Sequence, residues 1–340
     1  MADSDLPAVT LVIEWENAID VADEWTHRAM GALQREIEAA APRMPAKPRI
    51  MYLYDSGAVA PNVIDRTLDQ ISPGLRKVAE VEIVPTPGFS YYKLKNYGVA
   101  RSKTDLTVML DSDAAPQPGW LENLLKPFAD PEVMIVGGFT IMAHTDLVSK
   151  TMALIWLFDL PEEREKTAKK ILAHANNCAV RTDFFRAHPF PDYPMFKKHF
   201  GMWLKDLVAR GHGFVRTVDA MTVHAPHPGL GYVLWRGWQS GSDRDFQIYL
   251  EESAGRLRRV GSAFSFLVQK TRRNWKRIAR KGGLVGLPPR QRPAAMAMAL
   301  CYQLASTAGE VTSALRRTFI PVPAAYQRVG SQDAAAGQNS

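Results

Sequence analysis

Short runs of apolar and β-branched residues recur along the first 140 residues, each followed by a polar turn or an amphipathic stretch. Continuous apolar runs of this length are typical of strands buried on both faces. They predict strands at 9–14, 49–54, 81–84, 106–110 and 133–139. Apolar residues at helical spacing predict helices over 18–40 and 60–71. The alternation indicates an α/β fold, with a mostly parallel sheet covered by helices on both faces.

The pattern is less regular after residue 140. Helical spacing predicts helices over 147–159 and 162–173, the second of them rich in charge. A further helix is expected over 202–210, where Gly211 provides a stop signal. A strand is expected over 213–224, and it ends in a histidine.

Composition adds a division of the chain into two parts. The 340 residues are 46% hydrophobic and 23% charged, which is ordinary for a globular protein, and the net charge is +7. Residues 253–309 contain twelve of the 42 Lys and Arg and no acidic residue, which leaves 30 basic against 35 acidic residues elsewhere. We therefore expect a mildly acidic body over 1–250 and a basic helical region over 251–325. The polar residues 326–340 are expected to be a disordered tail.

The basic region begins with an amphipathic pattern. Its apolar residues recur at three- and four-residue steps, as on one face of a helix: Leu257, Val260, Phe264, Leu267, Val268, Trp275 and Ile278. Lys and Arg occupy most of the remaining face, which is typical of a helix that lies on an anionic membrane surface. The alternative is a helix packed on the body with its basic face in solvent. No nucleic-acid-binding motif accompanies the charge, so nucleic acid is not an expected partner.

A second helix is expected over 294–315. The segment is long enough to span a membrane and Glu310 is its only charged residue, but its many polar side chains make it poorly hydrophobic. Its apolar residues Met296, Leu300, Leu304, Val311 and Leu315 fall on one side at helical spacing. We expect an amphipathic helix that lies on a membrane or packs on a partner, rather than a span.

The expected compartment is the cytoplasm. Two cysteines, Cys178 and Cys301, cannot make a disulfide framework, and residues 1–7 contain acids but no apolar run. Neither feature fits a secreted protein. With the basic region, they predict a cytoplasmic protein peripheral to the inner face of the cell membrane.

Candidate chemistry is concentrated where the strand at 106–110 ends, in Asp111-Ser112-Asp113. Ligands of open α/β sheets bind outside the carboxyl ends of the strands. Two carboxylates one residue apart can converge on one hard divalent cation that also binds phosphate oxygens, so Mg²⁺ or Mn²⁺ is the expected ion. The alternative is an ordinary surface turn, because Asp is favoured in turns for backbone reasons.

The residues around this motif resemble a known family. The span KNYGVARSKTDLTVMLDSDAAPQPGWLENLL is similar to the signature of family 2 nucleotide-sugar glycosyltransferases, which have the GT-A fold. The shared features are an Asn-x-Gly helix, an apolar strand, Asp-x-Asp and then Pro-x-x-Gly-Trp-Leu. Weaker matches follow in the family's order over about residues 8–245. The resemblance implies a GT-A catalytic domain over 1–250, with a nucleotide-binding half at about 8–135 and an acceptor half at about 136–250.

The resemblance also implies roles for single residues. Asp111 and Asp113 would hold Mn²⁺ or Mg²⁺ against the donor diphosphate, with His224 as a candidate third ligand. The residues expected on the nucleotide side are Glu14, Glu16, Asp55, Lys95, Arg101, Asp111 and Ser112. Among these, Lys95 and Arg101 would neutralise phosphate charge. Each has a simpler alternative, such as a turn or a solvated helix face.

One feature of the family is missing. Its members carry a Glu-Asp pair at the start of the helix before an Arg-Gly turn, and the Asp accepts the proton of the acceptor hydroxyl. The family spacing places His199-Phe200 there. His199 is one candidate base because an imidazole titrates near neutral pH, and Asp192 in the preceding loop is another. A further carboxylate is the third alternative, and a surface histidine without a catalytic role is the simplest one for His199.

These features predict an enzyme that moves a single sugar from a nucleotide-diphosphate sugar to an acceptor hydroxyl, on a glycan or lipid-linked precursor, with inversion. The Gln-x-x-Arg-Trp motif of processive synthases is missing, and residues 235–239 only echo it. The alternative is a catalytically silent protein that uses the basic region as a membrane or partner scaffold. Asp111 and Asp113 argue against that alternative, and the missing acidic pair argues for it.

Overall fold

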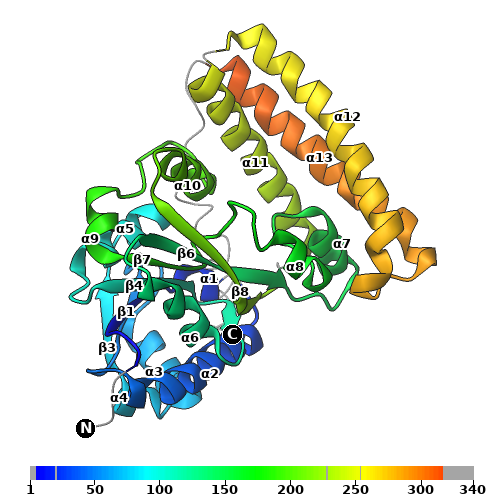
Figure 1. The fold of residues 1–340 in the computed structure, drawn as a ribbon. Coiled ribbons are helices and arrows are strands. Elements are labelled where there is room, and N and C mark those ends of the chain that lie inside the picture. The colour runs from blue at the N-terminus through cyan, green and yellow to red at the C-terminus, as the bar shows by residue number, and fades with distance from the viewer. Residues whose placement is uncertain (1–4, 20, 227–228, 253, 317–340) are drawn as a thin grey trace.

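A mixed eight-stranded sheet forms the centre of the molecule. The computed structural model describes residues 5–19, 21–226, 229–252 and 254–316, so the expected tail at 326–340 lies outside the described residues. The strand order is β3-β2-β1-β4-β7-β6-β8-β5 (Figure 1). The strands are β1 Val9–Glu14, β2 Arg49–Tyr54, β3 Glu80–Pro85, β4 Leu106–Asp111, β5 Ala114–Pro116, β6 Val133–Met142, β7 Asn177–Arg181 and β8 Gly213–His224. Neighbours among β1 to β4 are parallel, as are β6 and β8, whereas β7 and β5 run antiparallel to their neighbours.

Helices cover both faces of the sheet. In β1, Val9, Leu11 and Ile13 point into the larger core, and Val12 points to the other face. The helices of the first face are α2 Asp23–Ala40, α3 Pro61–Ile71, α4 Leu75–Val78 and α6 Trp120–Leu125; those of the second are α5 Tyr91–Arg101, α9 Thr182–Ala187 and α10 His199–Ala209. Short elements are α1 Glu16–Ile19, α8 Arg164–Thr167 and 3₁₀ turns at Ala41–Arg43, Lys126–Ala129, Pro161–Glu163, Gly282–Val285 and Pro289–Gln291.

The signature residues outside the carboxylate motif have structural roles. A Cβ at Gly98 would collide with Val12, so glycine lets α5 lie directly against β1. Trp120 is fully buried, and its indole N–H donates to Oδ1 of Asn177 at 2.8 Å. This bond ties α6 to β7, which shares a hydrogen-bonded ladder with β4.

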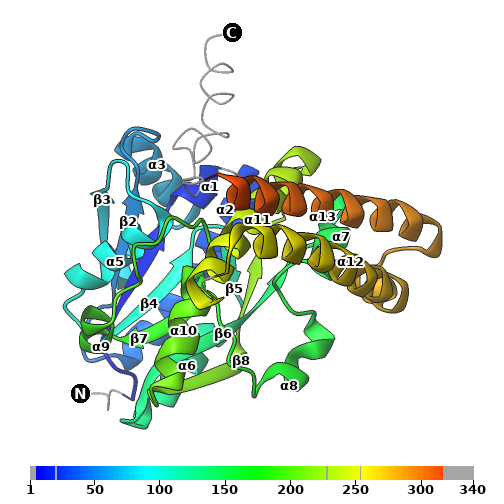
Figure 2. The same cartoon turned by 90° about the horizontal axis from the view of Figure 1, so that it is seen from above.

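The C-terminal part is a helical unit. It consists of α11 Gly229–Glu252, α12 Arg256–Lys281 and α13 Arg292–Leu315, and it packs on α7 Leu147–Ile155. Figures 1 and 2 show α12 and α13 side by side, projecting away from the sheet. Contact between α11 and α13 is close because Gly237, Gly241 and Gly309 leave no side chain between the backbones. The change from sheet to helices therefore comes at residue 229, inside the range that the sequence assigns to the body.

Most sequence-predicted elements are present, with two differences. The helix expected over 18–40 is two helices, α1 and α2. The helix expected over 162–173 is wrong, since only Pro161–Glu163 and α8 form helical turns there. Its charged side chains bind other elements instead: Glu163 accepts from Arg277 of α12 at 2.7 Å, and Arg164 pairs with Asp219 of β8. Within the described ranges, no helix combines the length and the apolar character that crossing a membrane requires.

Candidate functional site

The pairing of the strands brings the three predicted metal ligands together. Parallel pairing of β1 and β4 places Glu14 opposite Asp111 at their carboxyl ends. Asp113 follows β4, and pairing of β5 with β8 sets His224 opposite Ala114, one residue further on. One oxygen of each carboxylate and one ring nitrogen of His224 lie within 4.8 Å of one another, and all three residues are buried.

The donor atoms of this group fit a divalent cation. Nδ1 of His224 lies 2.8 Å from the carbonyl oxygen of Ala225, and because a carbonyl only accepts, Nδ1 must carry the hydrogen. In the neutral ring Nε2 then has a lone pair, and it lies 3.3 Å from Oδ2 of Asp113. Oδ1 of Asp113 is buried and has no hydrogen-bond partner among the described residues. Carboxylate oxygens suit Mn²⁺ or Mg²⁺, and the ring nitrogen of His224 is close enough to be a further candidate ligand.

Asp111 is held in place by neutral and positive donors. The Tyr91 hydroxyl and the Lys95 ammonium group each lie 2.8 Å from Oδ1, and Nδ2 of Asn17 donates to Oδ2 at 3.0 Å. Burial acts to raise the pKa of Asp111, but Lys95 and Lys197 outweigh it and lower the pKa below its ordinary value. Asp111 is therefore an oriented, ionised carboxylate.

The pKa values of Glu14 and Asp113 are raised, whereas that of Asp111 is lowered. Burial, and then the charge of Asp111, raise the pKa of Glu14 well above its ordinary value. Burial also raises the pKa of Asp113, against the lowering effect of His224. Oε1 of Glu14 is a second buried carboxylate oxygen without a partner in the described chain. The raised pKa values mean that burial disfavours the ionised forms of these two carboxyls, and a bound divalent ion would favour ionisation.

The other nucleotide-side candidates are dispersed. Lys95 is fully buried against Asp111, whereas Arg101 lies at the far end of α5 and pairs with Glu82 at 3.3 Å. Asp55 follows β2, and its Oδ1 accepts from the backbone N–H of Gly57 at 2.9 Å. Ser112 is buried between the two carboxylates, and Glu16 is the first residue of α1.

The two candidate bases lie beside the site rather than in it. His199 is buried, its Nε2 lies 2.9 Å from the carbonyl oxygen of Tyr193, and its ring packs 4.3 Å from that of Tyr92. Burial lowers the pKa of His199. Asp192 is exposed on the preceding loop. Neither residue belongs to the lining of the cavity that contains Asp111 and Asp113.

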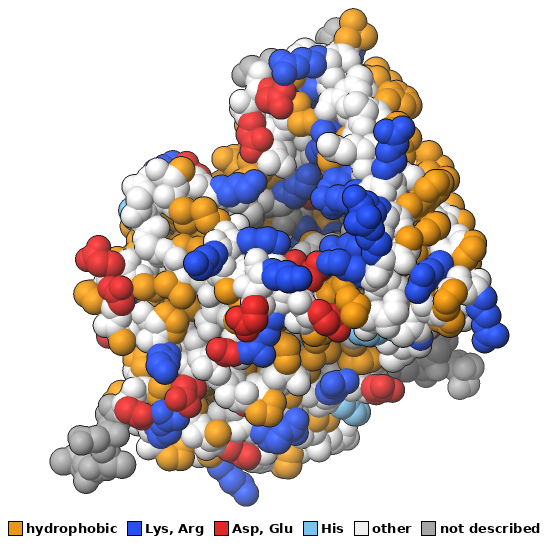
Figure 3. All heavy atoms as spheres, turned by 45° about the vertical axis from the view of Figure 1, so that its right-hand side comes forward, with side chains coloured by type: hydrophobic (Ala, Val, Ile, Leu, Met, Phe, Trp, Pro, Cys, Tyr) orange, Lys and Arg blue, Asp and Glu red, His pale blue; other side chains and the backbone are white. Residues whose placement is uncertain are grey.

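That cavity has a volume of about 460 Å³ and extends from the metal ligands to the helical unit. Its basic lining residues are Lys197, Lys198 and Lys205 around the start of α10, Arg236 and Arg244 of α11, and Lys270 and Arg273 of α12. Apart from Asp111 and Asp113, Asp243 is the acidic residue in its described lining. Figure 3 shows Lys and Arg side chains around the hollow between the two parts of the molecule.

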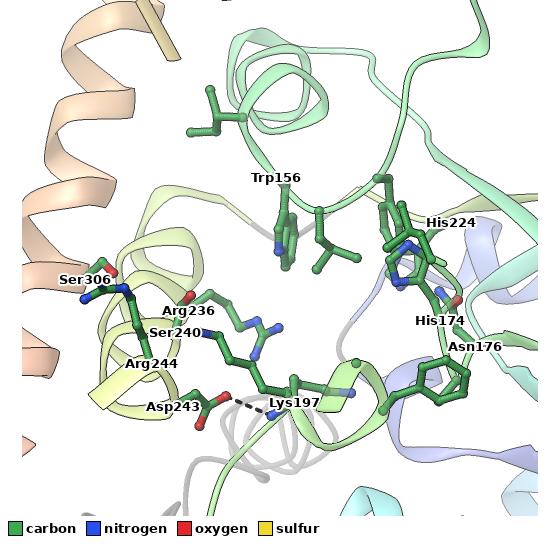
Figure 4. Close-up of a pocket in the computed structure, with 18 of the residues that line it drawn as sticks. Trp156, His174, Asn176, Lys197, His224, Arg236, Ser240, Asp243, Arg244 and Ser306 are labelled. Carbon is green, nitrogen blue, oxygen red and sulfur yellow. Dashed lines mark hydrogen bonds between the residues drawn. The ribbon is translucent and has the colours of Figure 1, made fainter. Parts of the chain in front are cut away.

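Three of these residues were not found by sequence reasoning. Asp243 of α11 accepts from the backbone N–H groups of Phe196 at 2.7 Å and Lys197 at 3.0 Å. Arg236 extends from α11 toward Trp156, whereas Lys197 points away from α11, toward the side of the cavity where His174 and Asn176 lie (Figure 4). Arg236 belongs to the segment that only echoes the processive motif, and no spacing rule connects α11 to the loop before α10. The fold alone brings them together.

Comparison with known proteins agrees with this geometry. Residues 64–188 match the model of glycosyl transferase family 2, a range that includes α5, β4 and both aspartates of the motif. This match covers the segment that carries the signature, and it agrees with the predicted family and enzyme class. The expected α/β fold with a mostly parallel sheet is the one observed.

Similarity to individual proteins is more local or more distant. A pre-mycofactocin glycosyltransferase of Mycobacterium tuberculosis is 50% identical over 42 residues, which are 12% of this chain and 9% of that protein. A mannosyltransferase from Pyrobaculum calidifontis, solved in complex with GDP-Man and Mn²⁺, superposes with a TM-score of 0.48 at 15% identity, covering 99% of this chain and 83% of that one. Mannosyl-3-phosphoglycerate synthase from Rubrobacter xylanophilus gives a TM-score of 0.49 at 15% identity, covering 73% and 76%.

Proposed function

We propose that this glycosyltransferase moves one sugar from a nucleotide-diphosphate sugar to an acceptor hydroxyl, with inversion, at a site that holds Mn²⁺ or Mg²⁺. The observation that carries the proposal is the buried group of Asp111, Asp113 and His224 at the carboxyl ends of the strands. Oδ1 of Asp113 is buried without a hydrogen-bond partner among the described residues, and a carboxylate oxygen is a suitable ligand for either ion. The acceptor hydroxyl belongs to a glycan or a lipid-linked precursor in this proposal.

The residues of the chain have distinct tasks at this end of the cavity. Asp111, Asp113 and His224 would hold the cation, which supplies Lewis-acid stabilisation of the charge on the departing nucleoside diphosphate. Tyr91 and Lys95 orient Asp111. Lys197, whose ammonium group lies 3.4 Å from the centre of the Tyr91 ring, adds positive charge beside the same leaving group.

A direct test measures release of nucleoside diphosphate and Mn²⁺-dependent thermal stabilisation by a panel of nucleoside diphosphates. A true ligand stabilises the native state by mass action. Asp113→Asn is expected to abolish both signals, whereas Glu80→Gln, an exposed change at the start of β3, leaves them intact. Absence of a metal-dependent shift for every nucleotide in the unmodified protein would sink the proposal and favour a scaffold.

Asp243 is the best-placed base for the acceptor hydroxyl. It lines the cavity, and its bonds to Phe196 and Lys197 place its carboxylate beside the start of α10. The resemblance implies an acidic pair at the start of that helix, and in this proposal the carboxylate of Asp243 takes over its role. In the transfer, the hydroxyl oxygen attacks the anomeric carbon, the bond from that carbon to the diphosphate breaks, and Asp243 accepts the hydroxyl proton.

Variants separate Asp243 from the two candidates proposed from sequence. Asp243→Asn should lower kcat by about 10²–10⁴-fold while metal-dependent nucleotide binding persists. Asp243→Glu should retain more activity, and Asp192→Asn and His199→Asn should cost little. A large kcat loss in Asp192→Asn or His199→Asn, with Asp243→Asn active, would transfer the role to that residue.

Peripheral attachment to an anionic membrane is the second part of the proposal. Four apolar side chains of α12, spaced by seven, four and seven residues, share one exposed face: Leu257 is 88% exposed, Phe264 56%, Val268 50% and Trp275 42%. Exposed basic residues flank this row, among them Arg258, Arg272, Lys276 and Arg280. An apolar row with basic neighbours is typical of a helix that lies in a membrane interface. Hydrophobic side chains along the outer edge of the helical unit are visible in Figure 3.

A further inference from the structure

The far end of the cavity has an excess of positive charge that the protein leaves largely unbalanced. Lys198, Arg244, Lys270 and Arg273 line it from three different elements. Arg244 pairs with Glu310 of α13, and Asp243, which precedes Arg244 on α11, already accepts two backbone N–H groups. Clustered cations in a half-enclosed space repel one another unless an anion lies between them.

Aromatic packing fixes two of these cations. The centre of the Phe266 ring lies 3.8 Å from the guanidinium carbon of Arg244 and 4.8 Å from the ammonium nitrogen of Lys270. Phe266 lines the cavity with them. Contact with one ring limits the conformations of both side chains, so less entropy is lost when they bind a ligand.

A buried and unpartnered donor provides an independent sign of a ligand. Asn274 is 2% exposed, lines the cavity, and its amide nitrogen has no hydrogen-bond partner in the described chain. Such a group is destabilising unless something binds it. Asn274 and Arg273 of α12 both line the cavity.

This group of residues is distinct from the donor end. The Lys197 ammonium group lies over the Tyr91 ring, and the hydroxyl of Tyr91 donates to Asp111. Arg244 and Lys270 instead contact Phe266 of α12, and Arg244 pairs with Glu310 of α13. A diphosphate held at Asp111 and Asp113 would therefore be served by Lys197, which leaves the α11 and α12 cations for another anion.

We infer that Lys198, Arg244, Lys270, Arg273 and Asn274 bind a phosphate group carried by the acceptor. The inference rests on the proposed function, because it assigns the acceptor side of the same cavity. The phosphate is a binding handle that is not transferred; it holds the acceptor so that a hydroxyl elsewhere on the molecule faces the anomeric carbon. Arg and Lys in this number suit a dianionic phosphomonoester or a diphosphate.

The test compares two double variants of α12 that remove equal charge. Lys270→Gln with Arg273→Gln changes the cavity wall, and Arg272→Gln with Lys276→Gln changes the exposed side of the same helix. Binding of methyl phosphate is measured by calorimetry in EDTA, and binding of nucleoside diphosphate is measured with Mn²⁺. The cavity double should weaken methyl phosphate by at least about tenfold and leave the nucleotide unchanged. The surface double should change neither.

The outcomes separate this inference from the proposed function. Suppose that the nucleoside diphosphate binds. If the unmodified protein binds no methyl phosphate, or if both double variants bind it as tightly as the unmodified protein does, the inference is wrong and the donor site stands. Suppose instead that no nucleoside diphosphate binds to any of the three proteins. If the cavity double variant alone has lost its affinity for methyl phosphate, the phosphate site stands and the proposed donor chemistry fails.

Two sources could supply the same phosphate, and a second comparison distinguishes them. Sugar transfer is assayed with a soluble sugar phosphate and with vesicles that contain a phosphomonoester lipid, each beside its dephosphorylated counterpart. If transfer occurs only to the phosphorylated lipid, and not to its dephosphorylated counterpart or to the soluble compounds, the acceptor is a lipid. If transfer occurs only to the soluble sugar phosphate, the acceptor is soluble. Equal transfer to both dephosphorylated counterparts overturns the inference.

Discussion

Lys95 neutralises the most tightly held carboxylate of the site. Its side chain is fully buried and its ammonium group lies 2.8 Å from Asp111. Removal of one partner of a buried pair leaves the other uncompensated, so Lys95→Gln should lower the free energy of unfolding by about 3–5 kcal/mol. Urea denaturation measures the change. Lys93→Gln, on the exposed side of the same helix, should change it by less than about 0.5 kcal/mol, and equal effects would contradict the assigned ion pair.

Two lysines that line the cavity, Lys198 and Lys270, have lowered pKa values. Burial lowers the pKa of Lys198 to about 8; Arg244 adds to this, and Asp243, Glu310 and Glu251 oppose it. Burial also lowers the pKa of Lys270 to about 8, and Arg273, Lys198 and Arg244 act in the same direction. Both groups therefore lose their protons in a pH range where an ordinary lysine keeps its own.

Methyl phosphate binding should consequently weaken as the pH rises from 7.5 to 9.5. The ligand is already dianionic at the start of this range, so the change reports the protein. Replacing both residues by arginine (Lys198→Arg with Lys270→Arg) keeps the charge and should flatten the profile, as calorimetry at several pH values would show. A profile equally steep in the double variant would assign the titration to other groups.

Individual site residues could be predicted only where local sequence fixes them. Asp111 and Asp113 follow an apolar strand, and that strand's position in the sheet determines where they lie. His224 could be proposed because it ends a strand. Asp243 and Lys197 could not, because their proximity depends on how α11 docks against the loop before α10. Lys95 was expected to neutralise phosphate, and its buried ion pair with Asp111 at 2.8 Å could not be foreseen from the sequence.

At the scale of elements, the contact between α11 and α13 depends on glycine. A Cβ at Gly241 would collide with the backbone of Ser306, so Gly241→Ala should lower the free energy of unfolding by about 1–3 kcal/mol. Gly261→Ala, on α12, has open space and should be neutral or stabilising by up to about 1 kcal/mol. Thermal or urea unfolding measures both. Similar destabilisation by the two changes would argue against the close helix contact.

The elements predicted correctly are those whose hydrophobic pattern is decided locally. Buried parallel strands are continuous apolar runs, and β1, β2 and β4 were found for that reason. The segment after Pro161 has helical spacing, but its charged residues bind α12 and β8 instead of forming a long helix. On α13 the predicted apolar side includes Leu304 and Leu315, which are exposed, while small and polar residues face α11. Close packing favoured small side chains over apolar ones.

At the scale of the whole molecule, membrane attachment should depend on the outer row of α12. Phe264→Ser should weaken binding to anionic vesicles by about tenfold or more, because a fully buried Phe contributes about 1.5–3 kcal/mol. Val63→Ser, an exposed apolar change on α3, is the control. Binding is measured by vesicle co-sedimentation at two salt concentrations, and higher salt should weaken it. Equal binding of the two variants would exclude this row as the contact.

The two hydrogen bonds of Asp243 have a mechanical consequence. They fasten the backbone of Phe196 and Lys197 to α11, and α11 is packed tightly on α13. A small rotation of the helical unit would therefore move the backbone that carries the Lys197 ammonium group relative to Asp111. If α12 binds a lipid surface as proposed, we expect that binding to alter the position of this charge beside the metal ligands, with Asp243 as the connection.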